Sequence, residues 1–215
     1  MLHVGLTGNV ASGKSSVARH FSQWGATVID SDRLVHEVQQ PGSDVLAAIV
    51  TRFGEGVLRS DGSLDRAVLR RSVMGNDTAL ASLNAIVHPA VGERRAHLLR
   101  EAQSRGDQVV VSDVPLLFEV LDPREFDVIV LVHAPIDLRR QRLIDQRGID
   151  PEEVDQLLAS QLDSETKRDR SDIVIENDST LADLEKRSRE AWDTLRALAA
   201  RGSDEGAAEE APGRS

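Results

Sequence analysis

The sequence predicts an α/β protein built on a doubly wound parallel sheet, and three features of the chain indicate this fold. Residues 8–15 match the pattern Gly-x-x-x-x-Gly-Lys-[Ser/Thr] and lie between a short apolar run and a helical pattern. Continuous Val/Ile/Leu runs, which are typical of buried parallel strands, alternate with amphipathic helical stretches. Residues 33–105 interrupt this alternation with successive helical patterns. Alternating strands and helices favour a doubly wound sheet, and the interruption is a helical insert.

The strands and helices of the sheet region follow from these patterns. A helix after residues 8–15 would bury Val17, Phe21 and Trp24 on one face. Asp150, before a proline and two glutamates, begins another helix. We expect strands at residues 2–6, 27–30, 108–113, 127–132 and 173–175, and further helices at 137–147, after 150 and at 180–200. In this fold ligands bind at the carboxyl ends of strands, where Asp30, Asp32 and Asp113 occur here.

The insert is expected to contain helices at 34–40, 43–53, 65–74 and 78–87 and a long helix after Pro89. The motif at residues 8–15 is typical of loops that bind nucleotide phosphates. The sheet region would then hold the nucleotide, and the insert would suit a second substrate. We therefore divide the chain into a P-loop nucleotide-binding core (1–32, 106–136 and 164–202), a helical substrate-binding insert (33–105), a small helical lid (137–163) and a disordered acidic tail (203–215).

Composition limits the classes of function. The chain has 215 residues, 40% of them hydrophobic, which is enough for a sizeable core. It has no cysteine, no apolar stretch of membrane-spanning length and no secretory signal, so we expect a soluble, cytoplasmic protein. The net charge of −10, with few aromatic residues, argues against nucleic-acid binding. We also expect no membrane partner and favour a monomer.

Residues 8–15 have the chemistry of a phosphate-binding loop. The start of a helix presents unpaired N–H groups and a dipole that favours anions. Gly8 and Gly13 allow a tight turn, Lys14 can reach the β and γ phosphates, and the Ser15 hydroxyl can bind Mg²⁺. We predict that ATP or GTP binds here, with Ala11, Ser12 and Ser16 as further nucleotide-binding residues.

A kinase is favoured over a switch GTPase. The D-x-x-G and N-K-x-D motifs of a GTPase are missing, since Val-Pro-Leu follows Asp113. Phosphoryl transfer needs a carboxylate near the acceptor hydroxyl and cations around the γ phosphate. Asp32, just beyond the second strand, can supply the carboxylate, although it could instead serve only as an N-cap. Asp113 could hold Mg²⁺ through water.

The expected lid carries the cations. A closing lid would bring guanidinium groups onto the phosphates and exclude water, although arginines on a helix surface are often only solvated. The arginines of the 137–147 helix are Arg139, Arg140, Arg142 and Arg147.

Three further short motifs occur along the chain: Asp30-Ser31-Asp32, His88-Pro89 and the hexapeptide 114–119. Taken in order with residues 8–15, they resemble the dephospho-CoA kinase family of P-loop kinases, and these three are the most specific elements of the resemblance. It extends from residue 2 to about residue 200, with further matching segments at residues 4–8, 41–42, 83–90, 142–143, 147, 161, 167–168 and 171–177. Asn9 departs from the family pattern, which has a second glycine there, and Ser31 replaces the usual alanine. Because asparagine tolerates unusual backbone angles, we expect the loop to survive this change.

The resemblance implies transfer of the ATP γ-phosphoryl group, with Mg²⁺, to the ribose 3′-hydroxyl of dephospho-CoA, the final step of coenzyme A biosynthesis. It implies Asp32 as the base, the 33–105 insert as the CoA-binding domain, and Arg142 and Arg147 near the nucleotide phosphates. Lys14 and Arg142 join Asp32 as catalytic residues. The implied substrate-binding residues are Thr7, Asp32, His88, Leu116 and Glu119.

Alternatives remain for several of these assignments. His88 could instead satisfy a helix end, and Leu116 could belong to the core. The rival functions are another P-loop kinase, acting on a nucleoside or nucleotide, and a nucleotide-binding module without an acceptor.

Overall fold

The computed structural model describes the backbone of residues 1–209 and the side chains of residues 1–201. The chain divides into two compact units, which are described separately below. The sheet unit comprises Met1–Ile29 and the chain from Ala102 onward, and the helical unit is Asp30–Glu101. The insert expected from the sequence had the bounds 33–105, so each bound of the helical unit lies three or four residues earlier.

The sheet unit is built on a five-stranded sheet with the order β2-β3-β1-β4-β5. Its strands are β1 (Leu2–Thr7), β2 (Thr27–Asp30), β3 (Val109–Asp113), β4 (Val128–His133) and β5 (Ile173–Glu176). The strands predicted from the apolar runs are confirmed. Neighbours β1 and β3, β1 and β4, and β4 and β5 pair in parallel. From β1 the chain continues to β2 at one edge of the sheet, and from β3 it crosses to β4 on the other side of β1. The connections that leave the neighbouring strands β1 and β3 therefore run in opposite directions, and the carboxyl ends of these strands form the switch point where ligands bind in such sheets.

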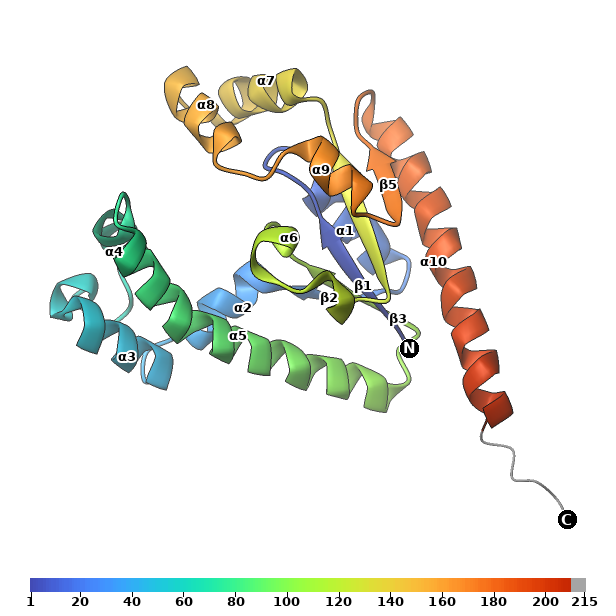
Figure 1. The fold of residues 1–215 in the computed structure, drawn as a ribbon, viewed down its shortest axis with the longest axis horizontal. Coiled ribbons are helices and arrows are strands. Elements are labelled where there is room, and N and C mark those ends of the chain that lie inside the picture. Colours follow the sequence, from blue (N-terminus) through green and yellow to red (C-terminus); the bar gives the residue numbers. More distant parts are fainter. Residues whose placement is uncertain (210–215) are drawn as a thin grey trace, which may run out of the picture. The chain divides into compact units, whose positions relative to one another are not determined.

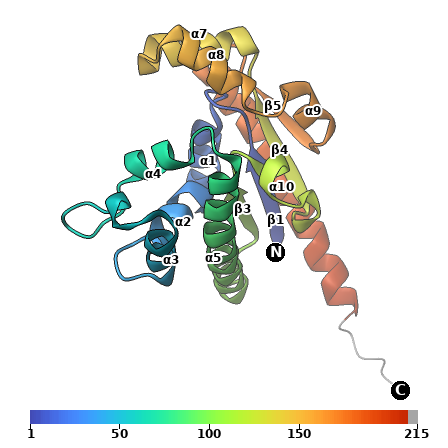
Figure 2. The same cartoon turned by 60° about the vertical axis from the view of Figure 1, so that its left-hand side comes forward.

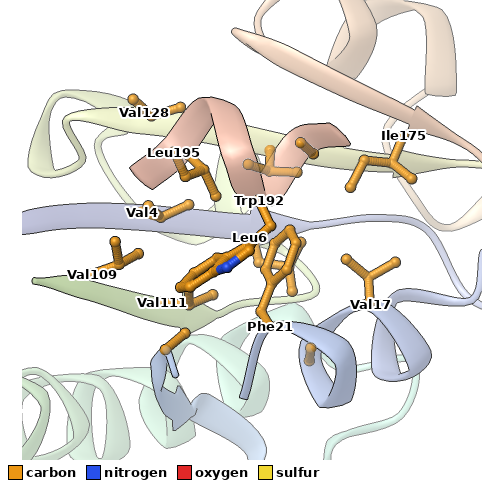
Figure 3. Packing of buried hydrophobic residues seen from close by; sticks show 14 of the residues in the cluster. Val4, Leu6, Val17, Phe21, Val109, Val111, Val128, Ile175, Trp192 and Leu195 are labelled. Atoms are coloured by element: carbon orange, nitrogen blue, oxygen red, sulfur yellow. The ribbon is translucent and has the colours of Figure 1, made fainter. Parts of the chain in front are cut away.

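Alternation along the strands produces two apolar faces. Val4 and Leu6 of β1 and Val130 of β4 point to one face, where they pack against α1 (Lys14–Gln23) and α10 (Leu181–Glu209). Figure 3 shows Phe21 and Trp192 at the centre of this packing, with their ring centroids 5.7 Å apart. This face anchors the helix that begins at the phosphate loop.

The opposite face is covered by a short segment after β3. Leu117 and Phe118 of α6 (Leu117–Val120) cluster there with Phe126 and Ile129. Gly5 of β1 faces this cluster, and a Cβ at Gly5 would lie 2.6 Å from Leu117 Cδ1. A larger residue at this position would therefore force the Leu117 side chain to shift within a closely packed core.

The other helices of the sheet unit are α7 (Ile136–Arg147), α8 (Pro151–Ala159) and α9 (Ser164–Asp169), with a 3₁₀ turn at Pro123–Glu125. Figures 1 and 2 show α7 and α8 side by side. Asp150 caps α8 by accepting a hydrogen bond from Glu152 N, as its sequence signal predicts. Helices α6 and α9 were not predicted, because they are too short to show a period.

The C-terminal helix is longer than predicted. The sequence suggested that it ends near residue 200 and that residues 203–215 are disordered, but α10 continues to Glu209. Alanine and glutamate in residues 204–209 favour helix, whereas Gly202 and Gly206 disfavour it, so the residues of this stretch give no clear signal of where the helix ends. Residues 210–215 of the expected tail lie outside the described residues.

The helical unit contains α2 (Ser31–Val38), α3 (Asp44–Phe53), α4 (Arg66–Val73) and most of α5 (Asp77–Arg105), with a 3₁₀ turn at Glu55–Val57. Its own core joins Leu46 and Ile49 of α3 to Leu69 of α4 and Val87 of α5. The sequence predicted a break at Pro89, and this was wrong, because α5 continues through it. A proline removes one N–H and its ring crowds the carbonyl of the preceding turn, but apolar packing along the rest of a long helix can offset this cost.

No helix within residues 1–209 combines the length and the hydropathy that crossing a membrane requires.

Candidate active site

The phosphate-binding loop lies between the carboxyl end of β1 and the first turn of α1. Gly13 is the N-cap of α1 and has a φ of 94°, which favours glycine. A Cβ at Gly8 would lie 2.6 Å from the backbone oxygen of Val132 and 2.7 Å from Ser12 Oγ. Both glycines are therefore required by the backbone, and the loop delivers the N–H groups of the first turn of α1 to one place.

The expectation for Asn9 was only partly right. The loop residue with an unusual backbone is Ala11, with a φ of 60°, and Asn9 is not among the described residues of positive φ. Asn9 is instead buried, and its amide donates to Leu162 O at 3.1 Å. Its contribution is therefore a side-chain hydrogen bond rather than an unusual φ.

Lys14, the first residue of α1, forms an ion pair with the residue that ends β3. Asp113 ends β3, pairs in register with Leu6 of β1, and its carboxylate forms an ion pair with the Lys14 ammonium. Ser15, the next residue of α1, is exposed. The site thus contains a cation, a carboxylate and a hydroxyl beside the N-terminus of a helix. Among the side chains of residues 1–201, no three of His, Cys, Asp or Glu are grouped so as to hold a metal.

The arginines of α7 occupy different environments. Arg142 donates to Ala11 O at 3.1 Å and to Asn177 Oδ1 at 3.2 Å, and burial lowers the pKa of its guanidinium. Arg139 is buried, with a pKa also lowered by burial, and donates to Ala134 O. Arg140 pairs with an aspartate of α8, and Arg147 is exposed. Of the four, Arg142 is the one that touches the phosphate-binding loop among the contacts described.

Helices α7 and α8 also pack on the loop through apolar contacts. Leu143 of α7 and Val154 and Leu158 of α8 form a buried cluster, against which Val10 and Ala11 pack. The expected lid is therefore in contact with the phosphate-binding loop in this structure.

Asn177 supports the loop, and the sequence analysis did not assign it to the site. It follows β5, is buried, and donates from Nδ2 to Ser12 O at 2.7 Å. A Cβ on Gly13 would lie 2.2 Å from this Nδ2. Its position directly after a strand, at the carboxyl edge of the sheet, was the available signal.

Three of the predicted acceptor-site residues lie at the carboxyl end of β1 and in the segment after β3. Thr7 is buried and donates from Oγ1 to Pro115 O at 3.2 Å. Leu116 is 40% exposed, whereas its neighbour Leu117 is fully buried, so only Leu117 belongs to the core. Glu119 forms an ion pair with Lys167, with Oε1 2.8 Å from Nζ.

Two further predicted site residues, Asp32 and His88, lie in the helical unit. Asp30 is the N-cap of α2 and accepts a hydrogen bond from Arg33 N at 3.0 Å. The alternative that Asp32 serves only as the cap is therefore wrong, and Asp32 lies exposed in the first turn of α2. His88 is exposed in the middle of α5, so it does not satisfy a helix end.

Comparison with known proteins agrees with this arrangement. The family model described as dephospho-CoA kinase matches residues 2–183. The chain belongs to the dephospho-CoA kinase family. A dephospho-CoA kinase of Thermobifida fusca is 45% identical over 195 residues, covering 91% of this chain and 96% of that protein. The dephospho-CoA kinase of Mycolicibacterium paratuberculosis is 40% identical over 89% of this chain, which spans only 47% of that relative.

Solved structures show the same fold. The structure of TT1252 from Thermus thermophilus matches with a TM-score of 0.76 and 34% identity, over 88% of this chain and 95% of that one. A dephospho-CoA kinase from Campylobacter jejuni matches with a TM-score of 0.70 at 21% identity, over 91% of this chain and 97% of that one. By its family, the protein is an ATP-dependent phosphotransferase of the final step of coenzyme A biosynthesis.

Proposed function

We propose that the protein transfers the γ-phosphoryl group of ATP to the ribose 3′-hydroxyl of dephospho-CoA. The observation that carries this proposal is the group of Lys14, Asp113 and the N-terminus of α1 at the carboxyl ends of adjacent strands. In a parallel sheet this is where ligands bind, and a cation beside free helix N–H groups suits a polyphosphate. The family supplies the identity of the acceptor.

The loop is proposed to hold the donor. The backbone and side chains of Gly8, Ala11, Ser12, Gly13, Lys14, Ser15 and Ser16 would surround the phosphates. Lys14 would exchange the Asp113 carboxylate for β- and γ-phosphate oxygens and so neutralise charge as the transferred group separates. Arg142, which bonds the loop at Ala11, would keep the loop in shape, and the exposed Arg147 would approach the phosphates when the lid closes.

Ser15 and Asp113 fit a magnesium ion that enters with ATP. A hydroxyl and a carboxylate are hard oxygen donors, and Mg²⁺ is commonly held by one or two such groups together with phosphate oxygens and water. When bound, the ion would offset the negative charge of the phosphates. When Lys14 turns to the phosphates, the Asp113 carboxylate with which it now pairs would face the ion, directly or through water.

Asp32 is proposed as the base that accepts the proton of the 3′-hydroxyl. Asp30 already caps α2, so the Asp32 carboxylate is not needed for that bond and is exposed. The helical unit would hold the rest of dephospho-CoA, with His88 on α5 as a contact to it. Thr7 and Leu116 would contribute from the sheet unit, close to the carboxyl end of β1.

The remaining expectations concern partners and location. We propose ATP and dephospho-CoA as the partners, with no nucleic acid or membrane involved, a monomeric protein and action in the cytoplasm. These stay predictions.

A coupled assay of ADP release tests the proposal, with dephospho-CoA, AMP and a nucleoside compared as acceptors. Dephospho-CoA should give the highest kcat/KM, and phosphorus NMR of the product should place the new phosphate on the 3′ oxygen. Stimulation by another acceptor alone would refute the substrate. ATP binding without turnover of any acceptor would instead favour a binding module.

Replacing Asp32 by asparagine tests the base. Asp32→Asn should lower kcat by about 100-fold or more, because general base catalysis is lost, while the Kd of ATP stays unchanged. Asp44→Asn is the matched control, since Asp44 is also an exposed carboxylate in the first turn of a helix of the same unit. An Asp32→Asn enzyme with the kcat of the control would remove Asp32 from this role.

A further inference from the structure

The segment 161–167, here called the latch segment, follows α8, includes the first four residues of α9 and is bonded to the phosphate-binding loop. Two consecutive loop residues, Asn9 and Val10, make these bonds. The contacts are Val10 N to Gln161 Oε1 at 2.9 Å, Asn9 Nδ2 to Leu162 O at 3.1 Å, and Asn9 Nδ2 to Ser164 Oγ at 3.3 Å. The conformation of this part of the loop therefore depends on where the latch segment lies.

The other end of the latch segment is fixed to α6 by a buried charge. The Lys167 side chain is fully buried, and its Nζ lies 2.8 Å from Glu119 Oε1. The same Glu119 oxygen accepts a hydrogen bond from Leu162 N at 3.3 Å. Within residues 1–201, Lys167 Nζ has no hydrogen bond of good geometry, so the Glu119 carboxylate is its main compensation.

Burial makes this ion pair a strong constraint on position. An ammonium removed from water is costly unless a carboxylate stays close to it, whereas removing both charges can be almost neutral. Glu119 is itself held in place, because the adjacent Leu117 and Phe118 pack in the core on that face of the sheet. Leu162 of the latch segment packs against the same core.

We propose that Glu119 and Lys167 are positioning residues for the nucleotide: they fix the latch segment, which in turn holds Asn9 and Val10 in the conformation that receives phosphate. This inference rests on the nucleotide site proposed above. It assigns Glu119 to the support of the donor side, whereas its position in the sequence suggested contact with the acceptor. The latch segment is thus held by Glu119 through Lys167 and bonded to the phosphate-binding loop through the Asn9 amide.

Equilibrium binding of a non-hydrolysable ATP analogue with Mg²⁺, measured by calorimetry, tests the proposal. Glu119→Gln should raise the Kd by about tenfold or more, because it leaves the Lys167 ammonium without its partner. Asn9→Ala keeps the backbone and removes the amide, and should raise the Kd by about five- to tenfold. Arg124→Gln is the control, because it breaks an ion pair whose arginine is 90% exposed, and it should leave the Kd unchanged.

Combined variants distinguish a positioning role from simple destabilisation. The effects of Glu119→Gln and Asn9→Ala should be less than additive, because both act through the latch segment. Glu119→Gln with Lys167→Met should bring the Kd to within about threefold of the wild type, since no charge is then left unpaired. In steady state, Glu119→Gln should raise the KM of ATP and leave the KM of dephospho-CoA within about twofold.

Several results would overturn the inference. These are a raised KM for dephospho-CoA alone, a lower unfolding midpoint with an unchanged Kd, or fully additive effects with Asn9→Ala. If Glu119→Gln does not fold, an unchanged Kd in Asn9→Ala still refutes it. Failure of the wild type to bind the analogue would refute the nucleotide site as well, whereas normal wild-type binding with unaffected variants refutes this inference alone.

Discussion

Replacing Asn177 by alanine tests how far the phosphate-binding loop depends on its support. The Asn177 amide donates to Ser12 O at 2.7 Å and accepts from Arg142 at 3.2 Å. Both bonds would be lost at a position that is only 4% exposed, where water cannot readily replace them. Arg142 would keep its bond to Ala11 O.

The magnitude follows from these two bonds. A neutral hydrogen bond contributes about 1 kcal/mol net and one to a charged group about 1.5–3 kcal/mol, and the longer bond to Arg142 belongs at the low end. The loss is therefore about 2–3 kcal/mol. If nucleotide binding has to restore the loop, the Kd of ATP would rise by at most about 30- to 150-fold, since 1.4 kcal/mol corresponds to a factor of ten.

Calorimetric titration with a non-hydrolysable ATP analogue measures this change, and urea unfolding followed by circular dichroism measures the cost to stability. The neighbouring Asp178→Ala is the control, because Asp178 forms an exposed ion pair with Arg187, and such pairs contribute little. The reasoning would be refuted if Asn177→Ala changed both the Kd and the unfolding free energy no more than the control does.

Three further substitutions give separate tests of the site and the fold. Lys14→Ala should raise the Kd of ATP by about 100-fold or more, because the ammonium that would bind the phosphates is removed together with its ion pair to Asp113. Lys186→Ala, at an exposed lysine, is the control and should leave the Kd unchanged. Unchanged affinity and rate in Lys14→Ala would disprove the phosphate site. Trp192→Ala, at a side chain 3% exposed, should lower the unfolding free energy by about 3–5 kcal/mol in urea titrations, and a loss below about 1 kcal/mol would contradict its central place in the core. Pro89→Ala should raise the unfolding free energy by about 1 kcal/mol by restoring an N–H donor within α5, and a decrease would show that the proline fits this helix better than alanine does.

Much of the sheet unit could be predicted because its signals are local. Residues 109–111 and 128–132 are continuous apolar runs, and the loop motif between a strand and a helix depends on backbone geometry. The break expected at Pro89 was wrong because it relied on a local signal alone. A local rule treats a proline as a helix end, whereas packing along α5 carries the helix through it.

The support of the loop could not be predicted, because its parts are distant in the sequence. Asn177 and Ser12 are bonded across 165 positions, and Asn9 and Leu162 across 153. Hydrogen-bonding side chains carry no periodic signal of their partners. The left-handed backbone occurs at Ala11, where the sequence pointed to Asn9, and Ala11 packs against the cluster of α7 and α8, which is likewise distant in the sequence.

The sequence by itself therefore determined the parallel sheet, the phosphate-binding loop and, through its ordered motifs, the family. These depend on residues adjacent in the chain or on residue types at fixed spacing. The tertiary structure alone decided that Lys14 pairs with Asp113, that Asn177 and Arg142 brace the loop, and that Glu119 is bonded to Lys167. Each of these is a contact between elements that only the packing of the sheet and its helices brings within bonding distance.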